Sequence, residues 1–167
     1  MTGVEQLCPN CGLCCDSTLF ADVELRAGDD AKKLRRLGLA LFAKTKTKLA
    51  FPQPCACFDG KLCKIYNDRP KRCRLFECGL LKKVEAGEMT AGAALKKIAV
   101  AKKRAGEVRE ILDSIGQRDE AMALTHRYAD AMSRPMDLAD VTDTGRRGEL
   151  MLAVNDLMTL LQRDFLR

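Results

Sequence analysis

Cysteine is the residue type in this sequence with the clearest chemical meaning. All nine cysteines lie between Cys8 and Cys78, and the chain beyond residue 78 contains none. So dense a set of thiols is typical of a fold held together by disulfides or by metal ions. Nine is an odd number, and the first residues show neither the basic nor the apolar region of a secretory signal. We therefore expect thiols that bind metal, in a cytoplasmic protein.

The first four cysteines form a compact string. Cys8, Cys11 and Cys14 are three residues apart, and Cys15 follows directly. Two intervening residues allow neighbouring sulfurs to reach one ion from a tight turn, and three sulfurs from one loop are typical of ligands to a cubane iron–sulfur cluster. Adjacent side chains diverge in most backbone conformations, so we expect Cys15 to serve a second, linked site.

The remaining cysteines are spread over a longer, loop-rich stretch that Gly60 and Pro70 punctuate. This second group consists of Cys55, Cys57, Cys63, Cys73 and Cys78. The two groups together supply enough sulfur for two four-coordinate centres with one thiol to spare.

Two ordered motifs give the sequence a resemblance to a known family. They are the string from Cys8 to Cys15 and the pattern Cys63-x-Ile65-Tyr66-x-x-Arg69-Pro70-x-x-Cys73-Arg74-x-Phe76-x-Cys78. These residues resemble the YkgJ-type cysteine cluster proteins, which are described as chelating zinc or iron through eight cysteines. The resemblance covers roughly residues 8 to 78, and it implies a metal-ligand set of Cys8, Cys11, Cys14, Cys15, Cys55, Cys63, Cys73 and Cys78.

The family's usual Cys-Pro-aromatic-Leu stretch maps onto Cys55-Ala56-Cys57-Phe58 with one extra thiol. Whether Cys55 or Cys57 is the ligand stays open. Sulfur ligation suits both an iron–sulfur cluster and zinc, in one or two centres. The three-sulfur loop favours the cluster, whereas the knuckle from Cys8 to Gly12 is also typical of zinc ribbons.

No catalytic residue is expected, and whether the chain is an enzyme stays open. A cysteine nucleophile would have only one histidine, His126, as its base, and clustered cysteines are more often ligands than nucleophiles. His126 lies far from the cysteines in the sequence, and we expect it to be an ordinary helix residue.

The fold class predicted is mainly α, or α+β with minor β. We expect short strands within 19–25 and 44–48, the latter because lysine alternates with threonine, and a short helix over 31–37. Longer helices are expected over 90–115, 119–133 and 145–165. Residues 1–83 would form the cysteine-cluster module, and 84–167 a helical hairpin or small bundle packed on it as one domain.

Charge bears on the choice of partners. Residues 1–83 contain 16 basic and 9 acidic residues, a net charge of +7, and residues 84–167 contain 13 basic and 14 acidic residues, a net charge of −1. Bound thiolates would cancel most of that excess, so we do not expect a nucleic-acid partner. No apolar run approaches the roughly 18 residues of a membrane span, which excludes a membrane protein.

The function predicted is metal chelation in the service of electron transfer, metal handling or assistance to a partner enzyme. The apolar stripe from Leu150 to Phe165 would bury against its own chain or against a second copy in a homodimer. The alternative is a structural zinc module that presents its basic face to nucleic acid or to a protein.

Overall fold

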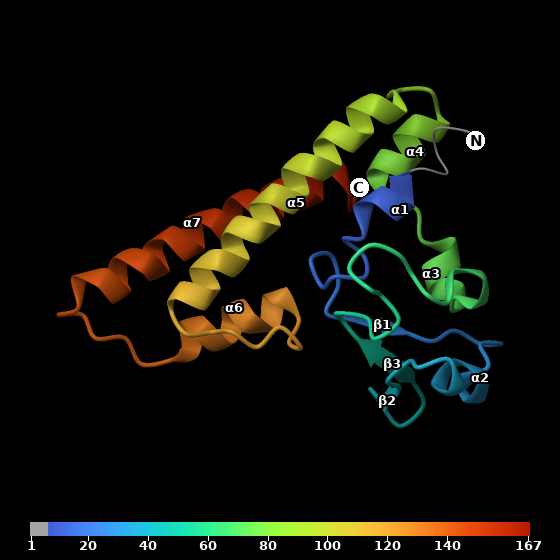
Figure 1. Ribbon diagram of the computed structural model, residues 1–167, viewed down its shortest axis with the longest axis horizontal. Coiled ribbons are helices and arrows are strands. Elements are labelled where there is room, and N and C mark those ends of the chain that lie inside the picture. Colours follow the sequence, from blue (N-terminus) through green and yellow to red (C-terminus); the bar gives the residue numbers. More distant parts are fainter. Residues whose placement is uncertain (1–6) are drawn as a thin grey trace.

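The computed structural model describes residues 7–167 and shows a long helical arm joined to a loop-rich body (Figure 1). Residues 1–6, which begin the module predicted over 1–83, lie outside the described residues. The helices are α1 (Leu7–Cys11), α2 (Ala31–Arg36), the 3-10 turn η2 (Tyr66–Asp68), α3 (Lys71–Leu75), α4 (Gly79–Glu85), α5 (Ala91–Ser114), α6 (Leu124–Ser133) and α7 (Val141–Asp164). The strands are β1 (Asp22–Glu24), β2 (Phe42–Ala43) and β3 (Leu49–Pro52). The prediction of a mainly α fold with minor β structure is confirmed.

Helix α5 forms where the sequence predicts it. The Thr90 side chain accepts a hydrogen bond from the Ala93 backbone N–H at 3.2 Å, which caps the first turn. Gly116 has a φ of +83° just beyond the last turn, a conformation that glycine adopts without strain. The predicted stop and start signals are therefore both confirmed.

Helices α6 and α7 begin at other residues than predicted. Asp119 closes a turn through residues 119–122, so α6 starts at Leu124 instead of residue 119. Asp140 accepts hydrogen bonds from the N–H groups of Thr142 and Asp143, so α7 starts at Val141 instead of residue 145. In both cases an aspartate side chain hydrogen-bonded to nearby backbone N–H groups sets the boundary.

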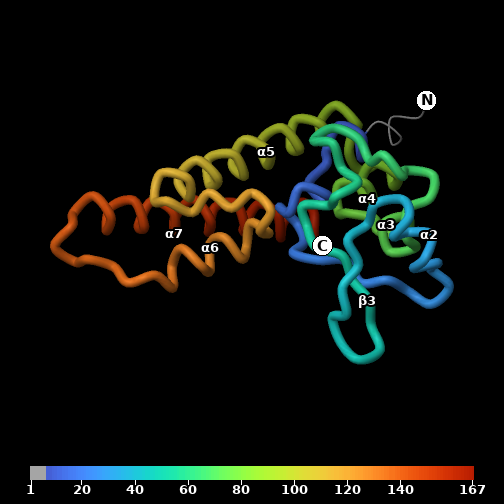
Figure 2. The backbone as a smooth tube through the Cα atoms, turned by 60° about the horizontal axis from the view of Figure 1, so that its bottom comes forward, coloured from blue at the N-terminus to red at the C-terminus, as the bar shows by residue number. Residues whose placement is uncertain are grey.

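Helices α5 and α7 run antiparallel along the arm, and α7 returns the C-terminus to the body beside α4 (Figures 1 and 2). Leu150, Leu157, Leu161 and Phe165 are buried within the chain. The predicted stripe on α7 thus packs against its own chain, while Met151 and Leu152 on the same helix are exposed. Within residues 7–167 no helix combines the length and the apolar character that crossing a membrane requires.

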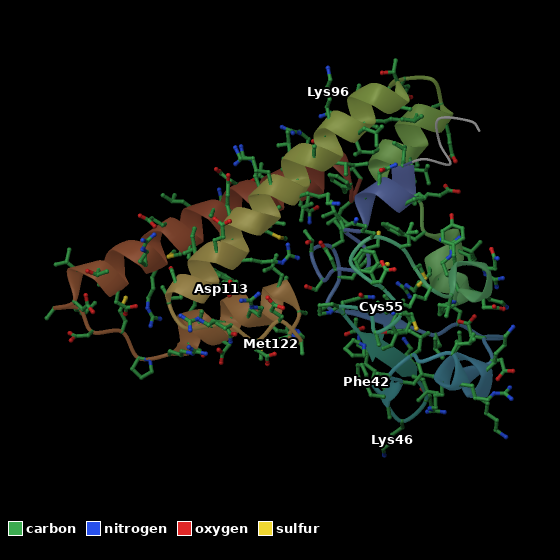
Figure 3. The ribbon with its side chains drawn as sticks, viewed as in Figure 1. Phe42, Lys46, Cys55, Lys96, Asp113 and Met122 are labelled. Carbon is green, nitrogen blue, oxygen red and sulfur yellow. The ribbon has the colours of Figure 1, made fainter. Side chains whose placement is uncertain are left out.

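A three-stranded antiparallel sheet with the order β1-β3-β2 occupies the body. β1 lies within the predicted strand 19–25 and pairs with β3, with Val23 opposite Phe51. The strand predicted over 44–48 is wrong, because these residues form the turn between β2 and β3. The alternating lysines and threonines have no apolar side chain to bury on either face, and Lys46 projects at the tip of the turn (Figure 3).

The apolar residues form two separate cores. The helical core joins α1, α4, α5 and α7 through residues such as Leu7, Leu80, Ile98 and Phe165. The sheet core packs the sheet against α2 through Val23, Leu34, Leu39, Phe51 and Ile65.

Candidate metal centre

A cavity of about 630 Å³ lies between the two cores and is lined by members of both. Its walls come from the loops that carry the cysteines, as well as from Leu80 and Phe165 of the helical core and from Val23 and Phe51 of the sheet core. The structure brings all eight predicted ligands to this one cavity: Cys8, Cys11, Cys14, Cys15, Cys55, Cys63, Cys73 and Cys78.

The first cysteine string is shaped by the end of α1. Cys8 and Cys11 lie on this short helix, and Gly12 follows with a φ of +72°. The Gly12 carbonyl accepts a hydrogen bond from the Cys15 N–H at 2.8 Å, which folds the string into a tight turn. A Cβ atom at Gly12 would lie 2.8 Å from Cζ of Phe58, so the second cysteine segment presses directly on this turn.

The loop after the string is held by the helical arm. Arg109 on α5 donates hydrogen bonds to the Asp16 carbonyl at 3.1 Å and to the Thr18 hydroxyl at 3.0 Å. The buried Ser17 hydroxyl accepts a hydrogen bond from the Leu124 N–H at the start of α6. The arm therefore fixes the position of Cys14 and Cys15 even though it carries no cysteine itself.

The second cysteine group arrives from several short elements. The chain leaves β3 so that the Cys55 N–H donates to the Cys15 carbonyl at 2.8 Å, which ties the two groups together. Cys63 pairs with Phe58 in an isolated antiparallel bridge, and Cys73 lies on α3. Figure 3 shows Cys55 in the loop-rich body, between the sheet and the helices above it.

Cys78 stands at the N-terminus of α4 and completes the set. The following residue, Gly79, is buried and donates its N–H to the Phe165 carbonyl at 2.9 Å. The C-terminal end of α7 therefore helps to hold Cys78 in place through its neighbour Gly79.

Cys57 behaves differently from the other cysteines. It is 3% exposed, and its Sγ donates a hydrogen bond to the Leu37 carbonyl at 3.4 Å. Of the nine cysteines, all within the described residues, it alone does not line the cavity. Cys55, and not Cys57, therefore faces the site.

Burial raises the pKa of several cavity thiols. It raises the pKa of Cys11, Cys15 and Cys73 to about 12 and that of Cys55 to about 11. Neighbouring thiols add to the rise in the pKa of Cys15, because Cys55, Cys63 and Cys73 lie around it. Without a cation these four thiols stay protonated at neutral pH, whereas a bound metal ion favours the thiolates and releases their protons.

The sulfur donors suit a metal that prefers sulfur ligands, but in this structure they are not arranged as a complete coordination shell. No group of three or more described Cys, His, Asp or Glu side chains converges closely enough to hold an ion in this arrangement. The cysteines lie on short helices and turns around a cavity, so small side-chain and loop movements would have to bring the sulfurs together around a metal. All-sulfur ligation is the donor chemistry of zinc and of iron–sulfur clusters.

Arg69 and Gln53 are cavity residues of other types. Arg69 lies over the Tyr66 ring, 3.5 Å from its centroid, and donates to the Tyr66 carbonyl at 2.7 Å, so it braces the loop before α3. Gln53 is 2% exposed, and its Oε1 finds no hydrogen-bond partner among residues 7–167. Sequence reasoning missed Gln53, and its place two residues before Cys55 was the only indication. His126 lies exposed on α6 and does not line the cavity in the described part of the chain.

A family model matches residues 7–99, and it is that of the CxxCxxCC family, described as a putative zinc- or iron-chelating domain. The match covers more than half of the chain, so the chain belongs to this family. It extends past the last cysteine through α4 and into α5, the helices that pack behind Cys78. Neither a curated protein nor a solved structure gave a match to the chain.

Proposed function

We propose that this protein binds iron, as iron–sulfur clusters, through Cys8, Cys11, Cys14, Cys15, Cys55, Cys63, Cys73 and Cys78. The observation that carries the proposal is the cavity, which is lined by these eight cysteines while Cys57 turns away from it. A family whose domain chelates zinc or iron is consistent with this donor set.

The arrangement of the sulfurs favours clusters over zinc. Cys8, Cys11 and Cys14 come from one helical turn and loop, and Cys78 comes from a distant helix start. Three closely spaced cysteines with a remote fourth are typical of cubane clusters, whereas structural zinc sites more often take their ligands as two separated pairs. The remaining four sulfurs come singly from separate segments, and they contain no such pair.

The site would exchange electrons or metal with a partner protein. Such a cluster, when bound, supplies reversible one-electron chemistry. Among the nine cysteines Cys8 is exposed, whereas the others are half-buried or buried. We infer that a partner approaches the site on the side of Cys8, while both cores keep water from the other sulfurs.

Nucleic-acid binding through a structural zinc module gains less support. Lys44 pairs with Asp22 at 2.7 Å, and Lys48 pairs with Glu24 at 3.2 Å. These acidic partners offset the charge of two of the three lysines in 44–48, the segment that would form a basic binding face.

The test is purification without oxygen, followed by metal and sulfide analysis and a visible spectrum. We expect iron, acid-labile sulfide and broad visible absorption, all lowered in Cys11→Ser/Cys14→Ser but kept in full in the matched control Cys57→Ser. Colourless protein with bound zinc would replace the iron proposal with zinc. A folded protein that takes up neither metal after reconstitution would disprove both.

A further inference from the structure

Six of the eight cysteines around the cavity divide between the two cores. Cys11 and Cys78 pack against the helical core. The members that belong to the sheet core or pack against it are Cys15, Cys55, Cys63 and Cys73. Each group of sulfurs therefore has its own apolar support.

The electrostatic influence of the thiols on one another follows the same division. Cys78 and Cys8 are the thiols that raise the pKa of Cys11. Cys55 and Cys63 are the thiols that raise the pKa of Cys73. Cys15 has neighbours in the sheet core, namely Cys55, Cys63 and Cys73. The thiols that contribute most to the raised pKa of Cys14, besides its burial, are Cys11, the adjacent Cys15, Cys78 and Cys8, and three of these four belong to the helical group.

The backbone explains how two adjacent residues serve different groups. The Cys15 carbonyl accepts the Cys55 N–H at 2.8 Å, which joins this residue to the segment leaving β3. Leu13, just before Cys14, is fully buried in the helical core. The chain thus passes from one core to the other at the peptide between Cys14 and Cys15.

We propose that the eight cysteines form two separate four-sulfur metal centres. The helical centre consists of Cys8, Cys11, Cys14 and Cys78, and the sheet centre consists of Cys15, Cys55, Cys63 and Cys73. The Cys14–Cys15 peptide links the two centres, and Cys57 belongs to neither. This division rests on the proposed metal binding, and it adds the ligand set of each centre.

The division has consequences for loading. Four sulfurs complete a tetrahedral site without a ligand from the other set, so each centre fills and empties by itself. The helical centre includes the exposed Cys8, whereas the sheet centre contains the buried Cys55 and three half-buried cysteines. Metal therefore leaves the helical centre first when a chelator is added.

Cadmium provides a direct test on the unmodified chain. Metal-free protein prepared under reductant without oxygen is loaded with ¹¹³Cd²⁺ alone, and each cadmium is correlated with the β protons of its cysteines by NMR. We expect two cadmium resonances, one correlated with each set of four. A single resonance, or a cadmium correlated with cysteines of both sets, would overturn the division.

Paired substitutions test the same division by stoichiometry. Cys8→Ser/Cys78→Ser removes two ligands from one centre and should lower bound Cd²⁺ from about two per chain to about one, since the other four sulfurs are intact. Cys8→Ser/Cys73→Ser leaves three sulfurs in each centre and should weaken the binding of both ions. Equal losses in the two pairs would contradict the division, and Cys57→Ser should keep both ions.

Failure of this inference is distinguishable from failure of the proposed function. Wild-type protein that binds cadmium and iron in one shared centre contradicts only the division. Wild-type protein that binds neither metal contradicts the proposed function. Because the cadmium correlation needs no substitution, an unfolded double variant does not remove the test.

Discussion

Gly79 lies directly against the last turn of α7, where its N–H donates to the Phe165 carbonyl at 2.9 Å. A Cβ atom at Gly79 would stand 2.7 Å from the Arg167 carbonyl oxygen and 2.8 Å from that of Asp164. Both neighbours are backbone atoms and do not swing aside as a flexible side chain would. The contact fixes the residue next to Cys78, so the C-terminus of the chain takes part in shaping the cysteine site.

Gly79→Ala should therefore displace α4 from the end of α7. We expect a loss of about 1–3 kcal/mol in the free energy of unfolding, because overpacked side chains force the backbone to move. Bound Cd²⁺ should fall as Cys78 shifts. Urea unfolding and cadmium stoichiometry measure the two effects.

Gly106→Ala is the matched control for this substitution. Gly106 lies inside α5, and a Cβ there meets nothing within 4 Å in the described part of the chain. Alanine should stabilise the helix by about 0.5–1 kcal/mol and leave metal binding unchanged. If both variants lose stability equally, the close approach at Gly79 is not the cause.

Gly12 and Gly60 form a second matched pair. Both have positive φ values, +72° and +93°, but a Cβ at Gly12 would lie 2.8 Å from Phe58, whereas one at Gly60 meets no described atom within 4 Å. Alanine at Gly60 should cost about 1–2 kcal/mol from backbone strain alone. Gly12→Ala should cost more and should weaken Cd²⁺ binding, because Phe58 or the cysteine turn must move. Denaturation midpoints and cadmium titrations that do not differ between the pair would argue against this contact.

The buried thiols predict how the stability of the metal-free protein depends on pH. The pKa of Cys15 rises from its ordinary value of 9.0 to about 12 in the folded chain, mainly through burial, and burial raises that of Cys73 equally far. The unfolded chain releases these protons near pH 9 and the folded chain does not, so the folded state binds more protons above that pH. Stability is therefore fully present below pH 9 and falls between pH 9 and 12.

Urea unfolding at a series of pH values, with chelator and reductant present, measures this dependence. Cys15→Ala/Cys73→Ala should flatten the decline relative to wild type. A midpoint that stays constant from pH 8 to 11 would contradict the raised pKa values.

Gln53 should limit the stability of the metal-free protein. Its buried Oε1 has no partner among the described residues, and an unsatisfied buried acceptor costs about 1–3 kcal/mol. Gln53→Met keeps a side chain of similar length without the polar atoms, so we expect metal-free protein to gain about 1 kcal/mol. Chemical unfolding of the metal-free variant gives the value, and a loss of stability would show that the amide makes a needed contact.

Much of the cysteine site was predictable from the sequence. The spacing of Cys8, Cys11 and Cys14 and the family resemblance identified eight candidate ligands, and the structure places all eight around one cavity. Their role as ligands stays a prediction until metal binding is measured. Gln53 was not found, because nothing in one sequence shows that an amide between two prolines will be buried beside a cavity.

Local signals likewise predicted the helices better than the sheet. The Thr90 cap and the regular apolar spacing located α5, since both act within a few residues of the chain. The alternating residues from Lys44 to Lys48 gave a wrong strand prediction, because a strand needs partner strands and a buried face as well as a suitable composition. The neighbouring segment Leu49–Pro52 has both and forms the strand.

By itself the sequence determined the chemistry of the site: soft sulfur donors, two ordered groups of them, and helices with clear caps. Tertiary structure alone decided which thiols face the cavity. Cys57 is held away from the cavity by a hydrogen bond to the Leu37 carbonyl, twenty residues earlier. Gly79, the residue after Cys78, donates a hydrogen bond to the Phe165 carbonyl at the far end of the chain. Such contacts join segments that meet only after folding, so a pattern of neighbouring residues does not predict them.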